Sequence, residues 1–444
     1  MEPQLKVETV CDPRSPQTTE RPALGFRLLL GSVFLAYFAG TAILYFVGPW
    51  HYPMEEGQRT FIAFLVAVHI AFAAGYAGGI RAIPARAALV VSVNTIVLAG
   101  VVAELLLLFP TSAFSTGSWI PLPWSAIQDL GAAYTMSLTL RDSGTPYVHY
   151  VRIIIAPLLA AAVPLGVFYW NTLGLLTKVL LCASVAGTIA LSVAMGANVG
   201  AAQWMVIFPW LVVASHLAGV HRLSLRGWMK LGAVQVLAVV LFLALFSATM
   251  VQRRGSFAKR GYMEGITAEI ETEPAARASR SAVEIGADGL AAYMTHGYFA
   301  VYLSLQEPFE PCYGVGNSVF LQRQLTRLTG NTRFVSCSYP ARIQSKGWNA
   351  TNYWATIYPW IASDVTFPGT VLVILLIGWV AGRVWLDVLG GRNPVAVAFF
   401  GQLLVMLYYF PAHNKIFHGG ETAFAFCSLF LGWLLTRCRK ASDR

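Results

Sequence analysis

Charged residues are scarce in this chain of 444 residues: they make up 12% of it, whereas hydrophobic residues make up 56%. Soluble globular domains carry about 25% charged residues, so the composition excludes that class. The chain also lacks the alternating segments of about 10 residues that indicate a transmembrane β-barrel. It contains instead a series of apolar runs of about 20 residues, each long enough to cross a bilayer as a helix. We therefore expect an all-α, polytopic membrane protein.

Other absences narrow the possible partners and cofactors. No basic helix or aromatic-basic platform lies in a soluble segment, so nucleic acid is not an expected partner despite the net charge of +10. The first 20 residues are polar and do not resemble a signal peptide, so we expect no cleavable signal. No Asp-x-Asp motif is present to hold a metal ion, so we expect a site that works without a metal or another cofactor.

Apolar runs predict about ten membrane spans, and lysine and arginine gather in the short loops on one side. The positive-inside rule makes that side cytoplasmic, and both terminal tails, 1–23 and 437–444, belong to it. The first seven spans form the membrane domain 24–250, and the last three lie within 354–436. The predicted spans are 24–48, 59–78, 87–109, 151–169, 175–195, 201–219, 231–250, 366–386, 393–411 and 419–436.

Two long segments, 110–150 and 251–353, are expected on the outer side. The second is basic although basic residues are normally scarce there, which suggests an ordered domain that handles an anionic ligand. Within it, residues 288–306 are apolar and aromatic, as in a re-entrant helix or a helix lying on the membrane surface. Cys312 and Cys337 share this loop, and an oxidising compartment favours a disulfide between them over two free buried thiols.

Several ionisable residues stand out elsewhere. Glu104 and His69 lie inside predicted spans, where an ionisable side chain is a functional candidate. His413 and His418 flank Lys415 in an outer turn, and they could line the same cavity as the large loop or bind lipid headgroups. Their spacing with a nearby glutamate does not match a zinc site.

Two stretches carry a resemblance to a known family. YMTHGYFAVYLSLQEPF at 293–309 and WIASDVTFPGTVLVILLIGWVAGRVW at 360–385 resemble segments of the Wzy-type O-antigen and capsule polymerases and of the wider polymerase and O-antigen-ligase superfamily. Arg254 and Gly265, in RGSFAKRGYMEG, are similar to an Arg-x10-Gly element of some polymerase loops. The layout of many spans with one large outer loop after the seventh resembles the same family.

This resemblance implies a GT-C-like, metal-independent, inverting glycosyltransferase in the bacterial inner membrane. Its donor would be an oligosaccharide on undecaprenyl diphosphate, and an acceptor hydroxyl would displace the lipid diphosphate at the outer face. The product would be a surface polysaccharide such as O-antigen, capsule or exopolysaccharide. A flippase and a chain-length regulator would be its protein partners, alongside the lipid bilayer.

The residue types present fit that chemistry. Arginine binds phosphate bidentately and stabilises the charge that develops on a leaving diphosphate. The base could be His296 or Asp364, and the sequence does not choose between them. The candidates for binding diphosphate are Arg254, Arg260, Arg280 and Arg152, and those for stacking against sugar are Tyr293, Tyr298 and Trp354.

Three alternatives remain open at this level. An O-antigen ligase would share the chemistry but use a different acceptor. A flippase or transporter of the same glycan lipid would also have many spans, although the chain shows no internal repeat. A transferase that uses a lipid monophosphate sugar would depend on Glu55 and Glu56 in the first outer loop.

Overall fold

The structure is a computed structural model that describes residues 22–85, 87, 91–142, 147–258, 267–268, 281–348 and 353–442. The described chain is almost entirely helical, and eight of its helices are long and apolar enough to cross a membrane. The protein is therefore a helical, multi-pass membrane protein. These eight helices are α1 (Leu24–Val47), α2 (Gln58–Gly79), α3 (Val93–Thr116), α6 (Tyr147–Phe168), α7 (Leu175–Ala194), α8 (Val199–Leu217), α9 (Leu225–Ala258) and α15 (Ile357–Leu389).

The two remaining predicted spans are also helices, α16 (Pro394–Tyr409) and α18 (Gly420–Ser442). Neither is among the eight, and α16 is a shorter apolar helix of 16 residues. Several helix boundaries differ from the prediction, and those of α3 and α15 have a visible local cause. The Ser92 side chain accepts a hydrogen bond from Thr95 N, so α3 begins at Val93, and it continues through Pro110. Helix α15 begins nine residues earlier than predicted, and the predicted start at Thr366 is a break in the helix with φ 66°.

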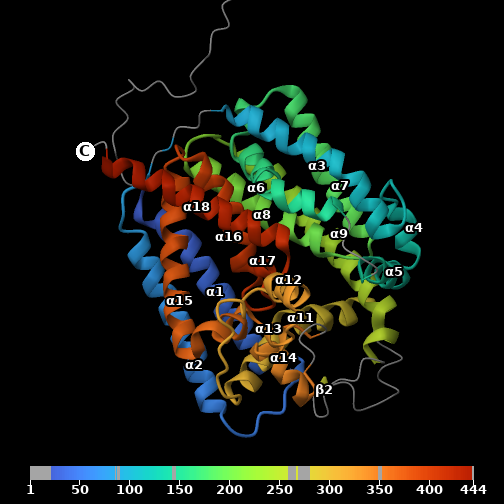
Figure 1. Cartoon of the computed structure of the whole chain (residues 1–444). Coiled ribbons are helices and arrows are strands. Elements are labelled where there is room, and N and C mark those ends of the chain that lie inside the picture. Colours follow the sequence, from blue (N-terminus) through green and yellow to red (C-terminus); the bar gives the residue numbers. More distant parts are fainter. Residues whose placement is uncertain are drawn as a thin grey trace, which may run out of the picture.

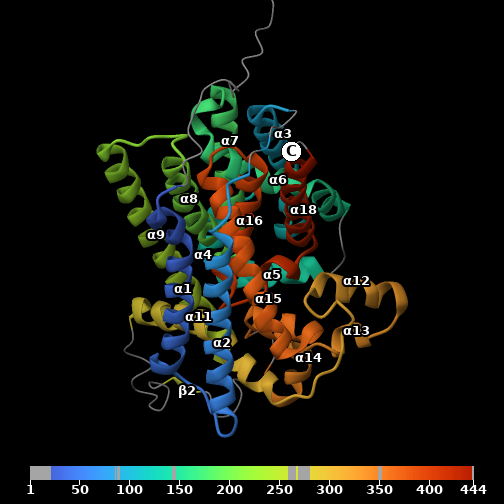
Figure 2. The same cartoon turned by 90° about the vertical axis from the view of Figure 1, so that its left-hand side faces the viewer.

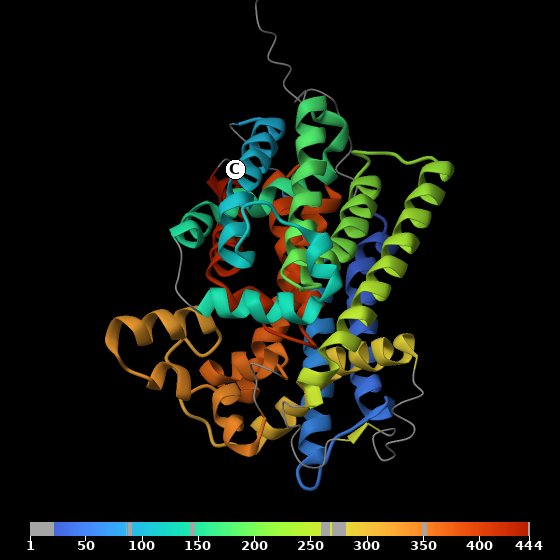
Figure 3. The ribbon, with the colours of Figure 1, turned by 90° about the vertical axis from the view of Figure 1, so that its right-hand side faces the viewer.

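Most of the remaining elements gather at one end of the bundle, which we call the loop face, whereas η1, between α6 and α7, lies at the other end near Gly391. Figure 1 shows α1, α2 and α15 side by side, with the loop helices α12, α13 and α14 to the right of their lower ends. In Figure 3, α11 runs across the direction of the spanning helices, as expected for a helix that does not span. The elements outside the spans are α4 (Pro123–Gln128), α5 (Leu130–Asp142), η1 (Trp170–Thr172), α11 (Ala282–Leu305), α12 (Val319–Thr329), α13 (Arg333–Ser336), α14 (Tyr339–Arg342), η2 (Ile343–Lys346), α17 (Lys415–His418) and the antiparallel pair β1 (Trp50–His51) and β2 (Thr267–Ala268).

Helices α2 and α15 pack backbone to backbone along a row of glycines. Gly75 and Gly79 of α2 face Gly378 and Gly382 of α15, each pair separated by three residues as in small-residue motifs of membrane helices. A Cβ atom on Gly382 would lie 2.7 Å from the carbonyl oxygen of Tyr76. The glycines on both helices therefore allow α2 and α15 to approach this closely. This contact fixes the position of α15, which carries part of the candidate site.

A buried carboxylate ties the helices together at the end opposite the loop face. Asp387 of α15 is fully buried, and it accepts hydrogen bonds from Trp433 Nε1 at 2.8 Å and from Arg437 Nη2 at 2.7 Å. The backbone N–H of Ala85 is a further donor. The same end of the bundle holds the C-terminal end of α18 (Figure 2). Asp387 therefore links α15 to α18 and to the chain that follows α2.

Substituting Asp387 by alanine is expected to destabilise the protein by about 3 kcal/mol, because it leaves the half-buried guanidinium of Arg437 without its counter-ion and the buried N–H of Trp433 without its acceptor. The loss should appear as a lower midpoint of thermal unfolding for the protein in lipid nanodiscs. Glu55→Ala provides the control, because Glu55 is exposed. An unfolding midpoint of Asp387→Ala equal to that of the control would contradict the anchoring role.

Candidate functional site

The loop domain is attached to the membrane bundle where α12 meets α17. The Asn414 side-chain amide donates hydrogen bonds to the backbone oxygen of Asn317 at 2.7 Å and to its side-chain oxygen at 2.9 Å. The Ser318 hydroxyl donates to the backbone oxygen of Phe417 at 3.1 Å, and it also caps the start of α12 by accepting from Leu321 N. These bonds hold the N-terminus of α12 against the turn between α16 and α18.

Two cations and two histidines come together across this junction. Arg323 of α12 and Lys415 of α17 both lie close enough to His418 to act on its charge. Burial, and then these two cations, lower the pKa of His418 to about 4. Burial likewise holds the pKa of His413 well below its ordinary value, with His418 and Lys415 adding to the effect. Both imidazoles are therefore neutral at pH 7, in a region of positive potential.

Neither imidazole is fully satisfied by the protein. Within the described ranges, the Nδ1 atoms of His413 and His418 are buried and have no hydrogen-bond partner. Arg323 is exposed and has no ion-pair partner in the part of the chain that the structure describes. A buried nitrogen without a partner carries a desolvation cost, which a polar ligand at this position would remove. The cluster of Arg323, Lys415, His413 and His418 is called the α17 cluster below.

A row of rings extends from the α17 cluster to α11. The ring centroids of Tyr293 and Trp354 lie 4.5 Å apart, and those of Trp354 and His413 lie 4.6 Å apart. His413 and His418 follow at 4.7 Å. Trp354 has a positive φ of 66°, an unusual conformation for a bulky residue, and such strain is concentrated at functional sites. The structure thus places two of the predicted sugar-stacking residues, Tyr293 and Trp354, beside the α17 cluster.

An apolar groove of about 350 Å³ lies between α15, α16 and α18. Leu376, which is exposed on the membrane-spanning part of α15, lines it, and so do Phe399 and Phe426. At its other end the groove reaches Asn317 and Phe417, the residues that join α12 to α17. The remaining lining residues are Ile357, Ile361, Asp364, Val365, Val373, Ile377, Val380, Met406 and Phe430. The groove therefore leads from the exposed side of α15 to the junction of α12 and α17, and Phe417 at that end directly precedes His418 in the chain.

Asp364 has a structural role beside this groove. Its carboxylate accepts backbone N–H hydrogen bonds from Gly314 and Gly316, both at 2.9 Å, and from Asn317 at 2.8 Å. A Cβ atom on Gly316 would lie 3.0 Å from the Asp364 carboxylate, so glycine is needed there. With three backbone donors, this carboxylate orders the loop before α12, and its role as the base stays a prediction.

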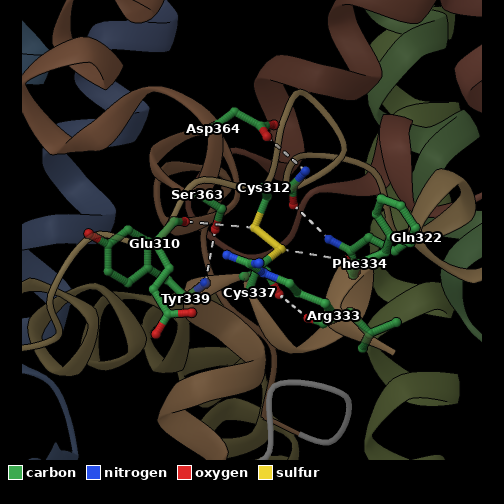
Figure 4. The surroundings of a disulfide bond; sticks show 12 residues. Glu310, Cys312, Gln322, Arg333, Phe334, Cys337, Tyr339, Ser363 and Asp364 are labelled. Carbon is green, nitrogen blue, oxygen red and sulfur yellow. Dashed lines mark hydrogen bonds between the residues drawn. A yellow bond between two sulfur atoms is a disulfide. The ribbon is translucent and has the colours of Figure 1, made fainter. Parts of the chain in front are cut away.

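A disulfide closes the same loop. Cys312 and Cys337, the pair predicted to be bridged, are joined with an S–S distance of 2.16 Å. Figure 4 shows the bond next to Ser363 and Asp364 at the end of the first part of α15. Ser363 accepts a hydrogen bond from Tyr339 N at 2.9 Å, and its backbone oxygen accepts one from Cys312 N. The bridge and Asp364 together hold the loop that leads to α12.

His296, the other predicted base, is enclosed by aromatic side chains. It is 8% exposed and hydrogen-bonds through Nδ1 to the hydroxyl of Tyr52. The rings of Trp50 and Trp348 lie 5.1 and 6.0 Å from its own. Burial lowers the pKa of His296 to about 3, so it takes up a proton only in strong acid. These surroundings favour a packing role for His296 and argue against the predicted role as base.

Two further predicted roles do not fit the structure. Tyr298 is fully buried, and its hydroxyl shares a hydrogen bond of 2.9 Å with Thr41 of α1, so it cannot reach a sugar. Arg152 is bound by two carboxylates rather than held available for phosphate. Its Nη2 lies 2.8 Å from Glu421 Oε1 and 3.2 Å from Glu104 Oε2. The two negative charges of these carboxylates exceed the one positive charge of the arginine, which disfavours binding of an additional anion.

The other three predicted cations cannot be placed at the site. Arg260 and Arg280 lie outside the described residues, and only the backbone of Arg254 is described, within α9. Arg323 takes the position at the junction instead. The sequence does not distinguish it from the other basic residues of the loop, because its proximity to His418 arises from the packing of α12 on α17.

No family model, no curated protein and no solved structure matches this chain. The function is therefore argued from the site itself. In the part of the chain that the structure describes, no three His, Cys, Asp or Glu side chains are placed so that they could hold a metal ion. The groups available at the junction are cations, neutral imidazoles, aromatic rings and an apolar groove.

Proposed function

We propose that this protein is a glycosyltransferase that takes its glycan from a lipid diphosphate carrier and extends a surface polysaccharide with it. The observation that carries the proposal is the apolar groove that runs from the exposed side of α15 to the junction of α12 and α17, where the α17 cluster holds two cations. A glycan on a lipid diphosphate has its groups in the same order as the site: an apolar chain for the groove, a diphosphate for the cations and a sugar for the aromatic rings. Undecaprenyl diphosphate is the bacterial carrier of this kind, and the loop face would be the outer face of the cytoplasmic membrane.

Each part of this substrate has a counterpart at the site. The isoprenoid chain would lie in the apolar groove and enter sideways from the bilayer past Leu376. The diphosphate would lie between Arg323 and Lys415, because guanidinium and ammonium groups bind phosphate oxygens through charge-assisted hydrogen bonds. The first sugar would then lie against the ring of Trp354, which adjoins His413.

The chemistry would proceed by a single displacement. An acceptor hydroxyl oxygen forms a bond to the anomeric carbon of the donor, and the bond from that carbon to the diphosphate oxygen breaks. The electron pair leaves with the lipid diphosphate, whose growing charge Arg323 and Lys415 stabilise. We assign the hydroxyl proton to the Nδ1 atom of His418, which has no protein partner among the described residues. A bound diphosphate would offset both cations and so raise the pKa of His418, while burial, the larger cause of its low pKa, would remain.

A reconstituted assay tests this function. The protein in lipid nanodiscs is incubated with oligosaccharide repeat units on undecaprenyl diphosphate, in the presence of EDTA, and the products are separated by glycan length. The expected result is a ladder of longer lipid-linked glycans together with free undecaprenyl diphosphate. In proteoliposomes, movement of the same lipid across the membrane without any change in its glycan would support a flippase and contradict the transferase.

A further inference from the structure

A second cavity, separate from the groove, lies within the bundle on the other side of α18. It has a volume of about 230 Å³ and is enclosed by α3, α6, α7, α8, α16 and α18. This is smaller than the ~300–1,000 Å³ of pockets for drug-sized ligands, so it suits one small molecule. The polar groups that matter for its chemistry are Glu104, Arg152, Gln203, Gln402 and Glu421, with the ring of Trp204 beside them.

The three charged side chains of this cavity are paired with one another. Arg152 binds Glu421 through Nε and Nη2 at 2.9 and 2.8 Å, and it binds Glu104 through Nη1 and Nη2, both at 3.2 Å. Two carboxylates share one guanidinium, which leaves an excess of negative charge. The remaining lone pairs of the carboxylate oxygens can accept hydrogen bonds from a neutral ligand, whereas an anion would be repelled.

The neutral part of the cavity has glutamines without protein partners. Gln402 lies within α16 and is 9% exposed, yet neither its side-chain oxygen nor its nitrogen bonds to any described residue. Gln203 of α8 also lines the cavity and has no side-chain partner in the described ranges. Two other glutamines are satisfied: the half-buried Gln235 donates to the backbone oxygen of Met205 at 2.8 Å, and the buried Gln322 donates to that of Gly316 at 2.9 Å.

An unpartnered amide inside a membrane protein is costly, and such residues usually mark a ligand site. Two amides supply donors and acceptors, two carboxylates supply acceptors, and Trp204 supplies a flat apolar face. Trp204 is held in place by its N–H, which donates to the Thr188 hydroxyl at 3.4 Å. This set of groups complements a ring that carries several hydroxyls and has one apolar face. We therefore propose that the cavity binds a single sugar ring.

The position of the cavity suggests which sugar this is. Thr422 lines it, and the Thr422 hydroxyl donates to the backbone oxygen of Ile416 at 2.6 Å, so the cavity and α17 share a wall. Glu421, which also lines the cavity, lies three residues after His418. The sugar would thus be the end of the acceptor glycan next to the donor site, and this part of the proposal rests on the proposed function. The binding of a sugar ring does not depend on it.

The test measures binding of simple sugars to the protein in lipid nanodiscs, since maltoside detergents themselves carry sugar headgroups. Saturation-transfer difference NMR is recorded with the methyl glycosides of glucose, galactose, N-acetylglucosamine and rhamnose as probes. Saturable binding of at least one glycoside is expected for the natural protein. Gln402→Leu, and independently Gln203→Leu, should weaken it by about tenfold or more, because each removes both a donor and an acceptor.

Gln235→Leu is the matched control. Gln235 lies in the neighbouring spanning helix α9, and its side-chain amide is hydrogen-bonded within the protein. This variant should leave glycoside binding unchanged, and Gln402→Leu should unfold at the natural temperature because no protein hydrogen bond is lost. Absence of saturable binding by every glycoside would overturn the proposal, as would equal binding by Gln402→Leu and the natural protein. Stabilisation by Na⁺ or K⁺ alone, lost in Gln402→Leu, would also overturn it in favour of a cation site.

Two further measurements separate the sugar-binding proposal from the proposed transferase function. Arg323→Gln should bind the glycoside normally, because Arg323 does not line this cavity. If the protein binds a sugar but transfers no glycan, the proposed function is contradicted and the sugar-binding cavity is supported. If Gln402→Leu and Gln203→Leu transfer glycan at the natural rate, the proposed function is supported, but the bound sugar is not the end of the acceptor glycan.

Discussion

Arg323→Gln is expected to lower the rate of glycan transfer by about 10²–10³-fold while the protein stays folded. The guanidinium is exposed at the junction and has no ion-pair partner among the described residues, so its loss leaves no buried charge uncompensated. Its expected contribution is instead to the transition state, where the bond to the lipid diphosphate breaks and negative charge accumulates. The rate is measured as glycan extension in nanodiscs with the donor at saturating concentration.

Matched variants distinguish this role from a general effect of charge in the loop. Arg323→Lys keeps the charge but loses the planar, bidentate geometry, so an intermediate rate is expected. Arg333→Gln removes an exposed arginine from the same loop, away from His418, and should keep the natural rate. If Arg323→Gln extends glycans as fast as Arg333→Gln, the diphosphate does not bind at the α17 cluster and the site as described is wrong.

Gly382→Leu is expected to be the most damaging substitution for the fold. Its Cβ would lie 2.7 Å from the Tyr76 carbonyl oxygen, and backbone atoms on α2 cannot move aside as a flexible side chain can. Overpacking costs about 1–3 kcal/mol in ordinary cores and more where backbone must shift, so we expect a loss at or above about 3 kcal/mol. The readout is the yield of monodisperse protein and its midpoint of thermal unfolding.

Gly40→Leu is the control for this substitution. Gly40 also lies in a spanning helix, α1, but no atom lies within 4 Å of the position where its Cβ would be. The same change in size and hydrophobicity should therefore be tolerated there. Equal yield and thermal stability of the two variants would show that close approach of α2 and α15 is not required for folding.

The membrane class and the position of the helices follow directly from the sequence. A run of apolar residues is a local property, and each predicted span contains a helix in the structure. The differences lie at the ends. Pro110 suggests the end of a helix but α3 continues through it, and Thr366 marks a break inside α15 rather than its start. Local propensity is overridden at both positions by packing within the bundle.

The site is a different matter, because its members come from distant parts of the chain. The sequence offers His296 as a base, and it offers His418 only as a residue that could line the same cavity or bind lipid headgroups. Only the fold seals the first among Trp50 and Trp348 and leaves the second beside Arg323. Arg152 is similar: it is predicted from the sequence to bind diphosphate, whereas folding brings it two carboxylates from α3 and α18.

The length of the apolar runs and the scarcity of charge were enough to indicate a helical membrane protein, and the two cysteines of the large loop predicted its disulfide. Each of these signals resides in a continuous stretch of chain. The partners of each charge, the groove that leads to α17 and the unpartnered amide of Gln402 were decided by tertiary structure alone. The physical reason is that charge pairing and desolvation depend on distances in space, which separation along the chain does not determine.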